Sequence, residues 1–360
     1  MTQLTRRAAL AVGASALALP AVASAQSAGQ IAAAKKDGRL NVIALPPDWA
    51  NYGEIISTFE KKYGIKVNSA APDDSSAQEL QAIRSLKGQT RGPDTVDVGP
   101  TFAISGVKEG LWQPYKVATW ASIPANMKEA SGLWYGDYFG IISLGVNRSV
   151  VKNPPKTWAD LLKPEYKGMV ALNGSPSGAA AAFSGVYAAA LGNGGSLDNI
   201  EPGIEFFGKL AKAGNFNPAS ATPASLQSGT TPIVLNWDYL NLAQAKKSVG
   251  KVQIDTILPE GAQPLGAFYC QAISKYAPNP ASAKLWMEFL YSDEGQLLFL
   301  KGFAHPARFA DLAKRNAIPA ALAKTLPPAA PYAAAAFPTA AQQDKAKNVI
   351  AANWSKMVKV

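Results

Sequence analysis

The chain is predicted to fold as an α/β protein with two lobes. Apolar runs that suit buried strands alternate with amphipathic helical patterns between residues 39 and 99, as in an α/β layer structure. The sequence has 360 residues, and about 335 remain after an N-terminal export segment, which is more than one hydrophobic core usually serves. With 48% hydrophobic and 17% charged residues, the composition is that of a globular chain.

The first 25 residues are predicted to be a cleavable export signal. Thr5-Arg6-Arg7 precedes an apolar run from Ala8 to Val22, and Ala23-Ser24-Ala25 supplies the small residues of a cleavage site. The paired arginines favour the twin-arginine route. The apolar run is shorter than the ~20 residues that a membrane-spanning helix needs, and no Cys lies near the cut for lipid attachment. We therefore expect cleavage near Ala25 and a soluble mature chain in the periplasm.

The region that follows supplies the first strands and helices. Residues 39–45 form an apolar run that ends at Pro46-Pro47, which predicts a buried strand followed by a loop. Apolar residues at helical spacing then continue to Gly64, a typical helix stop. The other elements expected here are a strand at 65–68, a helix capped by the loop 72–76 and a strand at 95–99. This alternation predicts a mainly parallel sheet.

The second half of the chain continues the α/β pattern. Strands are expected at 138–146, 169–172, 231–235, 252–258 and 265–273, and helices up to Leu191 and at 200–213, 281–300 and 342–357. The stretch from Ala317 to Ala341 is rich in Ala and Pro and is expected to wrap the surface. No internal repeat is present.

The scarcity of cysteine and histidine argues against an enzyme. Cys270 is the only cysteine, in an apolar strand pattern, and His305 is the only histidine. One of each cannot build a structural zinc site, and no G-x-S-x-G elbow accompanies His305. We expect no metal and no cofactor. An exported hydrolase that works with carboxylates alone, such as Asp48, Asp74 or Asp238, is the remaining enzymatic alternative, and no spacing singles out a pair of them.

The net charge of +10 does not by itself indicate a nucleic-acid partner. Arg6 and Arg7 in the predicted signal account for two of these charges, and the lysines occur in scattered pairs such as Lys35-Lys36 and Lys246-Lys247. Scattered lysine is typical of a solvated surface, so we expect no nucleic-acid partner.

Several motifs resemble the periplasmic solute-binding proteins of ATP-driven importers, in the group of iron, polyamine and phosphonate binders. One is the strand and helix from Leu40 to Gly64, and another is Pro-Asp-Thr-Val-Asp-Val-Gly at 93–99. The most specific is Pro-Lys-Thr-Trp-Ala-Asp-Leu-Leu-Lys-Pro-Glu-Tyr-Lys-Gly at 155–168, followed by a strand. The helical region 281–300 with Ser-Asp-Glu-Gly-Gln is the fourth. The resemblance covers essentially the whole mature chain.

The resemblance implies a type II binding-protein fold with a ligand cleft between two lobes. Lobe one is expected to hold residues 26–143 and 260–360, and lobe two residues 144–259. Hinge closure would bury one small-molecule ligand, and the closed monomer would present it to a membrane permease. A sensor subunit that hands its ligand to a membrane receptor is an alternative that the sequence does not separate from transport.

The candidate ligand contacts are the loops that follow the strands. Ligands of open α/β sheets sit outside the carboxyl ends of the strands, which nominates loops in both lobes and the expected hinge. The candidate residues are Trp49, Asn51, Tyr52, Ser75, Thr101, Phe102, Tyr138, Ser175, Ser177, Gly178, Trp237, Asp238, Tyr239, Phe268 and Tyr269.

Two ligand chemistries compete at these positions. Aromatic residues beside carboxylates, as in Trp237-Asp238-Tyr239, suit an ammonium group, which a ring face attracts within about 6 Å, so an amine or polyamine is preferred. The same rings also suit a core or a lobe interface. Ser175-Pro176-Ser177-Gly178 is expected at a helix start, where it suits a phosphate or carboxylate or serves as an ordinary cap. The family's ferric-ion binders commonly use adjacent tyrosines, which this chain lacks, although an iron chelate stays open.

Overall fold

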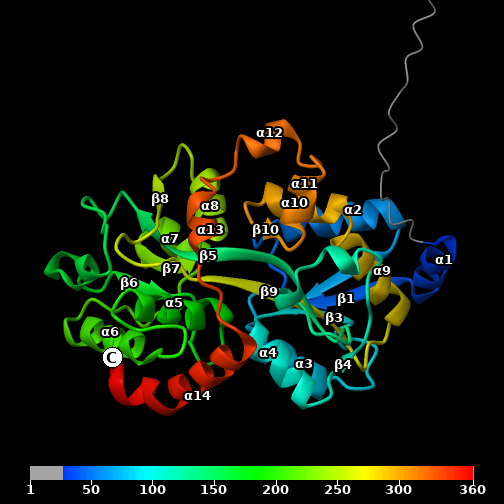
Figure 1. The fold of residues 1–360 in the computed structure, drawn as a ribbon, viewed down its shortest axis with the longest axis horizontal. Coiled ribbons are helices and arrows are strands. Elements are labelled where there is room, and N and C mark those ends of the chain that lie inside the picture. The colour runs from blue at the N-terminus through cyan, green and yellow to red at the C-terminus, as the bar shows by residue number, and fades with distance from the viewer. Residues whose placement is uncertain (1–26, 360) are drawn as a thin grey trace, which may run out of the picture.

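Two groups of strands and helices lie side by side and are joined by two long strands (Figure 1). The structure is a computed structural model that describes residues 27–359. The predicted export signal, its twin-arginine motif and the cleavage site near Ala25 therefore lie outside the described residues. We call the group that contains β1–β4 lobe one and the group that contains β6–β8 lobe two.

Lobe one begins with the strand–helix–strand unit that its sequence predicts. β1 (Arg39–Ile43) pairs in parallel with β2 (Lys66–Ala70), and α2 (Tyr52–Tyr63) connects them and ends at Gly64 in the left-handed conformation (φ 67°). The other elements of lobe one are α1 (Ala28–Asp37), α3 (Ser76–Ser85), β3 (Thr95–Val98), α4 (Pro100–Lys108), β4 (Trp112–Gln113), the 3₁₀ helices Trp120–Ser122 and Ala125–Met127, α9 (Pro280–Leu290), α10 (Asp293–Lys301), β10 (His305–Pro306) and α11 (Phe309–Lys314).

Lobe two is built around β6 (Val170–Leu172) and β7 (Ile233–Trp237), which are parallel neighbours. Its other elements are the 3₁₀ helices Ala159–Leu162 and Pro164–Tyr166, α5 (Ala180–Leu191), α6 (Glu201–Lys212), α7 (Pro223–Ser228), α8 (Asp238–Lys247) and β8 (Ile254–Ile257). The motif at 155–168 forms the segment that precedes β6, and its own side chains hold this segment in place. Trp158 packs edge-on against Phe206, and the Asp160 carboxylate accepts the Lys156 and Thr157 amides at 2.9 Å.

The two long strands are β5 (Tyr135–Asn147) and β9 (Gly266–Ser274), and they run antiparallel to each other. The strand order is β3-β9-β5-β7-β6, with β5 also antiparallel to β7 and β8, and β9 antiparallel to β3. The prediction of a mainly parallel sheet in the first lobe is confirmed for β1 and β2 but is wrong for β3, which pairs antiparallel with β9. Helix–strand alternation holds within each lobe, but the strands that pass between the lobes run in opposite directions, and periodicity carries no information about strand direction.

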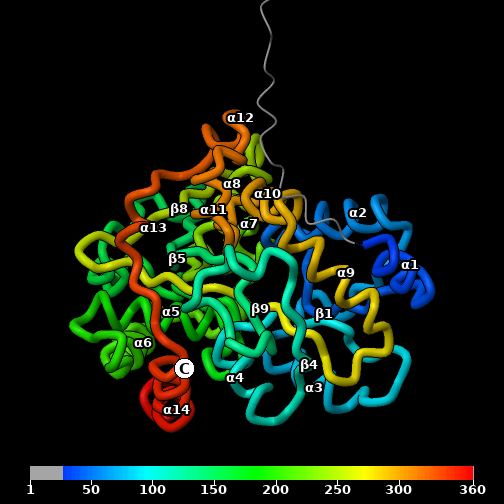
Figure 2. Tube along the Cα trace, turned by 45° about the vertical axis from the view of Figure 1, so that its right-hand side comes forward, coloured from blue at the N-terminus to red at the C-terminus, as the bar shows by residue number. Residues whose placement is uncertain are grey.

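The C-terminal segment lies against both lobes. It descends through α12 (Ala320–Ala323) and α13 (Ala330–Ala334) to α14 (Ala340–Met357) (Figures 1 and 2). Asp344 of α14 pairs with Lys108 of α4 at 3.0 Å, and the ring of Trp354 packs on Phe207 of α6 with centroids 5.4 Å apart. The sequence groups all of 260–360 with lobe one, whereas α14 contacts α4 of lobe one and α6 of lobe two.

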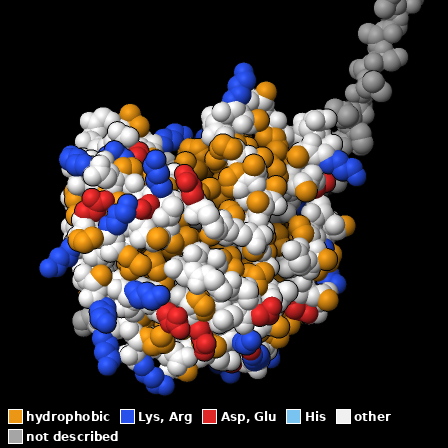
Figure 3. Space-filling model, turned by 60° about the vertical axis from the view of Figure 1, so that its left-hand side comes forward, with side chains coloured by type: hydrophobic (Ala, Val, Ile, Leu, Met, Phe, Trp, Pro, Cys, Tyr) orange, Lys and Arg blue, Asp and Glu red, His pale blue; other side chains and the backbone are white. Residues whose placement is uncertain are grey.

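The surface carries no single basic patch on the face drawn in Figure 3, where Lys and Arg side chains are dispersed among acidic ones. Within residues 27–359, no helix is long and apolar enough to cross a membrane. Cys270 is buried in β9, and burial raises the pKa of its thiol well above the ordinary value, so it packs as a small apolar side chain.

Candidate functional site

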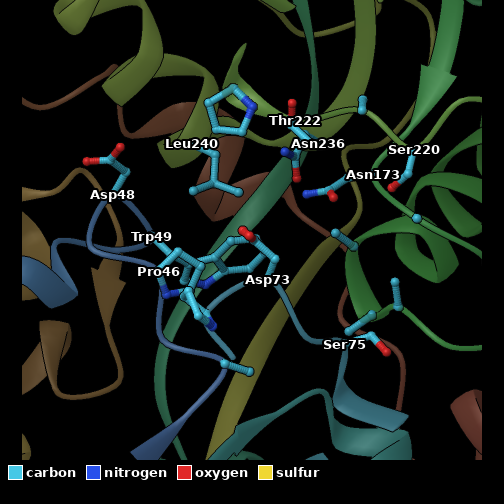
Figure 4. Close-up of a pocket in the computed structure, with 18 of the residues that line it drawn as sticks. Pro46, Asp48, Trp49, Asp73, Ser75, Asn173, Ser220, Thr222, Asn236 and Leu240 are labelled. Atoms are coloured by element: carbon cyan, nitrogen blue, oxygen red, sulfur yellow. The ribbon is translucent and has the colours of Figure 1, made fainter. Parts of the chain in front are cut away.

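A cavity of about 620 Å³ lies between the two lobes. Lobe one contributes the loop after β1, the loop before α3 and part of α3, and lobe two contributes the loop after β6, the start of α5, the segment 220–223 and α8. Asp48, Trp49 and Asp73 lie on one side, and Asn173, Ser220 and Asn236 face them from the other (Figure 4). A cavity of this size between lobes is a typical small-molecule site.

Trp49 gives the lobe-one wall its aromatic surface. The chain leaves β1 through Ala44, whose φ is 56°, and turns at Pro46 and Pro47. The Trp49 indole N–H donates to the Tyr138 hydroxyl at 2.7 Å, and its ring meets Tyr269 edge-on with centroids 5.5 Å apart. The indole is therefore held in place while part of it remains at the cavity.

Two buried carboxyl groups, Glu79 of α3 and Asp97 of β3, also line the cavity. Their relative exposures are 1% and 4%, and Glu79 Oε2 accepts the Asp97 amide at 3.0 Å. Asp97 Oδ2 accepts the hydroxyls of Tyr52 and Tyr138 at 2.9 and 2.7 Å. Burial, followed by the charge of Asp97, raises the pKa of Glu79 well above its ordinary value. Burial and then the charge of Asp137 do the same to the pKa of Asp97.

The lobe-two wall combines neutral polar and apolar side chains, and Lys247 is its one charged residue among those described. Its amides and hydroxyls include Asn173, Ser220, Thr222 and Asn236 (Figure 4). The first turn of α5 also reaches the cavity through Ala180 and Ala181. This wall offers donors and acceptors for a polar solute, and the start of α5 brings a helix N-terminus to it.

Contacts across the cavity mouth hold the lobes together. Asp48 of lobe one forms an ion pair with Lys247 of lobe two. The Ala77 amide donates to the Gly178 carbonyl at 3.4 Å, and the Lys246 ammonium lies 5.6 Å from the Phe303 ring centroid. These contacts join lobe one to lobe two beside the cavity.

Five of the candidate residues line this cavity: Trp49, Ser75, Ser175, Gly178 and Tyr269. Ser75 stands at the start of α3, where its hydroxyl and the Gln78 side chain form a capping box. Ser175 and Gly178 form a turn in which the Gly178 amide donates to the Ser175 carbonyl at 3.0 Å. Ser177 belongs to this turn but lies outside the lining and is exposed.

Four other candidate residues form an aromatic layer behind the cavity wall. Tyr52, Tyr138, Trp237 and Tyr239 are each at most 1% exposed. The Tyr52 and Tyr138 hydroxyls donate hydrogen bonds to Asp97 Oδ2. The Trp237 and Tyr239 rings stack with centroids 6.3 Å apart. The Trp237 indole N–H donates to the Tyr269 hydroxyl at 3.4 Å. We call these four residues the rear layer; they contact the cavity wall rather than the cavity.

The remaining candidates have structural partners elsewhere. Asp238 is buried, accepts the Ile141 amide of β5 at 2.8 Å and bonds the Tyr332 hydroxyl. Phe268 stacks on Trp134, and the Lys347 ammonium lies 4.6 Å from the Phe102 ring centroid.

Asn51 and Thr101 stand at the starts of helices rather than at the cavity. Asn51 precedes α2 with φ 70° and donates to the Leu298 carbonyl at 2.9 Å. Thr101 is buried in the first turn of α4, where its carbonyl accepts the Ser105 hydroxyl at 2.9 Å.

The predicted anion cradle at Ser175–Gly178 differs from a helix start. α5 begins two residues later, at Ala180, and its N-cap is Ala179, which has no capping side chain. The serines complete a turn before the helix instead of capping it. The prediction of a serine-capped helix at this point is therefore wrong.

Sequence reasoning missed the two carboxyl groups at the inner wall. Glu79 occurs in the amphipathic pattern of α3 directly before Leu80, which makes it look like an ordinary helix surface residue. Asp97 lies inside the short strand β3, whereas the candidates were drawn from the loop after it. A carboxyl group within an otherwise apolar, buried strand is the feature that could have identified Asp97. Such a group is seldom buried unless it is paired or hydrogen-bonded.

The described residues 27–359 contain no group of three or more His, Cys, Asp and Glu side chains arranged to hold a metal ion. Both His305 ring nitrogens lack a hydrogen-bond partner among these residues, and burial lowers the pKa of His305 to about 4. His305 is thus a neutral side chain, packed on Tyr332 with ring centroids 3.9 Å apart.

Two α/β lobes with a cavity between them define the class of two-lobe binding proteins. Residues 94–341 match the family model described as bacterial extracellular solute-binding protein. The chain belongs to this family, which is a family of solute-binding proteins and not of enzymes.

Individual relatives extend this assignment. The chain is 29% identical over 151 residues to a probable ABC transporter periplasmic-binding protein, y4fP, of Sinorhizobium fredii, and the match spans 41% of this chain and 42% of that protein. The periplasmic binding protein AfuA from Actinobacillus pleuropneumoniae, solved with fructose-6-phosphate, superposes with a TM-score of 0.70 at 17% identity over 90% of this chain and 99% of that chain. Iron-bound HitA from Pseudomonas aeruginosa superposes with a TM-score of 0.66 at 20% identity, over 89% of this chain and 99% of that chain. These structural matches establish the type II fold and leave the ligand open.

Proposed function

We propose that this protein is the periplasmic substrate-binding component of an ABC importer and that it captures a small polar organic solute, preferably one that bears an amine. The cavity between the lobes carries the proposal, because five carboxylic acids line it against one lysine, Lys247, which is paired with Asp48. Lobe one, residues 26–143 and 260–360, would close on lobe two, residues 144–259, and bury the solute. The closed monomer would then deliver the solute to a membrane permease.

An anionic solute is the second candidate. The first turn of α5 reaches the cavity, and helix N-termini favour phosphate and carboxylate groups. A phosphate ester, a carboxylate or an iron chelate would be placed with its negative end on the lobe-two wall, away from Glu79 and Asp97.

Native mass spectrometry of the freshly purified mature protein tests both candidates. A retained solute would appear as a mass increment that identifies an amine, a phosphate ester or a metal complex. In parallel, a thermal-shift panel of amines, amino acids, sugar phosphates and carboxylates should contain at least one stabilising solute, because a ligand that binds only the native state raises its stability. A protein that retains no solute and is stabilised by none would contradict the proposal.

A further inference from the structure

We propose that Glu79 and Asp97 form the subsite that holds the cationic group of the solute, and that a carboxyl proton leaves for bulk water when this group binds. This inference rests on the proposed function. It names the ligand class as ammonium or guanidinium compounds and assigns the contact to residues that lie in α3 and β3, behind the loops that usually supply ligand contacts.

The first argument is the unused hydrogen-bonding capacity of the two carboxyl groups. Asp97 Oδ2 is occupied by the Tyr52 and Tyr138 hydroxyls, whereas Asp97 Oδ1 is buried and has no partner among residues 27–359. Glu79 Oε2 is occupied by the Asp97 amide, and no residue in the same described range donates to Glu79 Oε1. A buried polar atom without a partner costs free energy, and Asp97 belongs to the cavity lining, so a donor supplied by a ligand would relieve this cost.

The second argument is the missing counter-charge. Among the described residues, no Lys, Arg or His side chain forms an ion pair or hydrogen bond with Glu79 or Asp97. The one lysine in the cavity lining, Lys247, is paired with Asp48. Two neighbouring carboxyl groups out of water cannot both ionise at low cost, and a cation between them would relieve the repulsion. Trp49 and Tyr269 line the same cavity and provide ring surfaces that attract a cation.

The proton step follows from the surroundings of the pair. Both carboxyl groups have a raised pKa, for which burial is the largest cause, so the ligand-free pair holds a proton more tightly than exposed carboxyl groups do. A cation stabilises the ionised form, and the proton that is displaced passes to the buffer. The titratable groups that interact electrostatically with the pair are Tyr52 of α2, Asp74 before α3, Asp137 and Tyr138 of β5, Tyr239 of α8, Tyr269 and Cys270 of β9, and Tyr291 after α9.

Titration calorimetry with matched small molecules tests the subsite. The probes are 1,4-diaminobutane and 4-guanidinobutylamine as cations, 1,4-butanediol as the uncharged counterpart, and fructose 6-phosphate as the anion. We expect the cations to bind more tightly than the diol and the anion. Glu79→Gln and Asp97→Asn should each weaken cation binding at least about tenfold, which corresponds to about 1.4 kcal/mol. The control Asp73→Asn removes a charge from an exposed residue of the same lining and should change the affinity less than about threefold.

Proton release separates a binding role from a structural one. Repeating the calorimetry at pH 6 in two buffers of different ionisation enthalpy should show proton release by the wild-type protein, and the release should shrink in Glu79→Gln and Asp97→Asn. Gln and Asn retain the acceptor oxygens used inside the protein, so the ligand-free variants should melt at the wild-type temperature or above it, because an uncompensated carboxyl group has been removed.

Three results would overturn the inference. It fails if cations bind the wild type no more tightly than 1,4-butanediol, if both variants keep the wild-type affinity, or if cation binding releases no proton. If the purified protein instead retains an anionic or neutral solute, the cation subsite is wrong while the proposed solute-binding function stands. If no solute is retained and none stabilises the protein, the proposed function itself fails.

Discussion

Trp49 and Trp237 lie within one aromatic cluster, yet they have different surroundings. Trp49 is partly exposed at the cavity and meets the rings of Tyr239 and Tyr269 edge-on. Trp237 is 1% exposed and stacks on Tyr239 in the rear layer. The comparison teaches that one layer of aromatic side chains lines the cavity while the next layer holds that first layer in place. Mutations in the two layers should therefore affect different measurements.

The largest effect is expected in the rear layer. Trp237→Ala should lower the free energy of unfolding by about 3–5 kcal/mol, because it removes a large, fully buried side chain and leaves a cavity. Chemical denaturation measures this loss. Trp49→Ala is the matched control and should lose clearly less stability, since its ring is only partly buried. Equal losses in the two variants would remove the distinction between the layers.

Next in size is the loss of solute binding at the cavity wall. Trp49→Ala should weaken binding of the retained solute roughly tenfold or more, in line with about 1–2 kcal/mol for a ring that contacts a cation or an apolar stem. Trp49→Phe keeps a ring but removes the N–H that bonds Tyr138, so it separates ring contact from positioning. Titration calorimetry on both variants measures the affinity for the solute and distinguishes the two roles. An unchanged affinity in Trp49→Ala would show that this residue is not part of the binding site.

The buried carboxyl groups behind the wall should make stability depend on pH. Burial raises the pKa of Asp137 to about 7, so the folded state binds this proton more tightly than the unfolded state does. That contribution is full below pH ~4 and is lost as pH rises through 7, which predicts a fall of about 1 kcal/mol between pH 6 and pH 8. Asp137→Asn should reduce this fall in thermal melts.

His305 acts in the opposite direction at lower pH. Its pKa is lowered to about 4 by burial, so the unfolded state gains a proton first as the pH falls below about 6.5, and stability decreases. Between about pH 4 and 6.5 the two trends oppose each other and largely cancel, so stability should be nearly flat there and should fall above pH ~6.5. A steady rise in stability from pH 6 to pH 8 would contradict the carboxyl contribution.

The smallest effect is expected at the cavity mouth. Lys247→Ala breaks the ion pair with Asp48, whose side chains are 54% and 50% exposed, so the change in stability should stay within about 0.2–1 kcal/mol and shrink with added salt. Denaturation at low and high ionic strength measures it. A loss of several kcal/mol that is insensitive to salt would show that the mouth is more rigid than the walls.

The sequence predicted individual helices and strands better than the pairing between strands. Apolar spacing located α2 and Gly64 closely, because a helix period and a glycine stop are local features. The directions of β5 and β9 were missed because strand pairing is set by distant residues. Of the candidate residues, Trp49 and Tyr269 line the cavity whereas Trp237 and Tyr239 lie behind it, and nothing in residue type or spacing distinguishes these positions.

The helix α14 links the lobes in a way that chain order does not suggest. Its contacts to α6 are aromatic, through Trp354, whereas its contacts to α4 include the exposed pair Lys108–Asp344. The Lys347 ammonium of α14 also lies over the Phe102 ring of α4 and donates to the Ser105 hydroxyl at 3.1 Å, so α14 is held to both lobes. Reversal of the proposed closure should therefore break one of these two sets of contacts. A pair of spectroscopic labels on α14 and α4 would turn the opening angle into a distance, without any label near the solute.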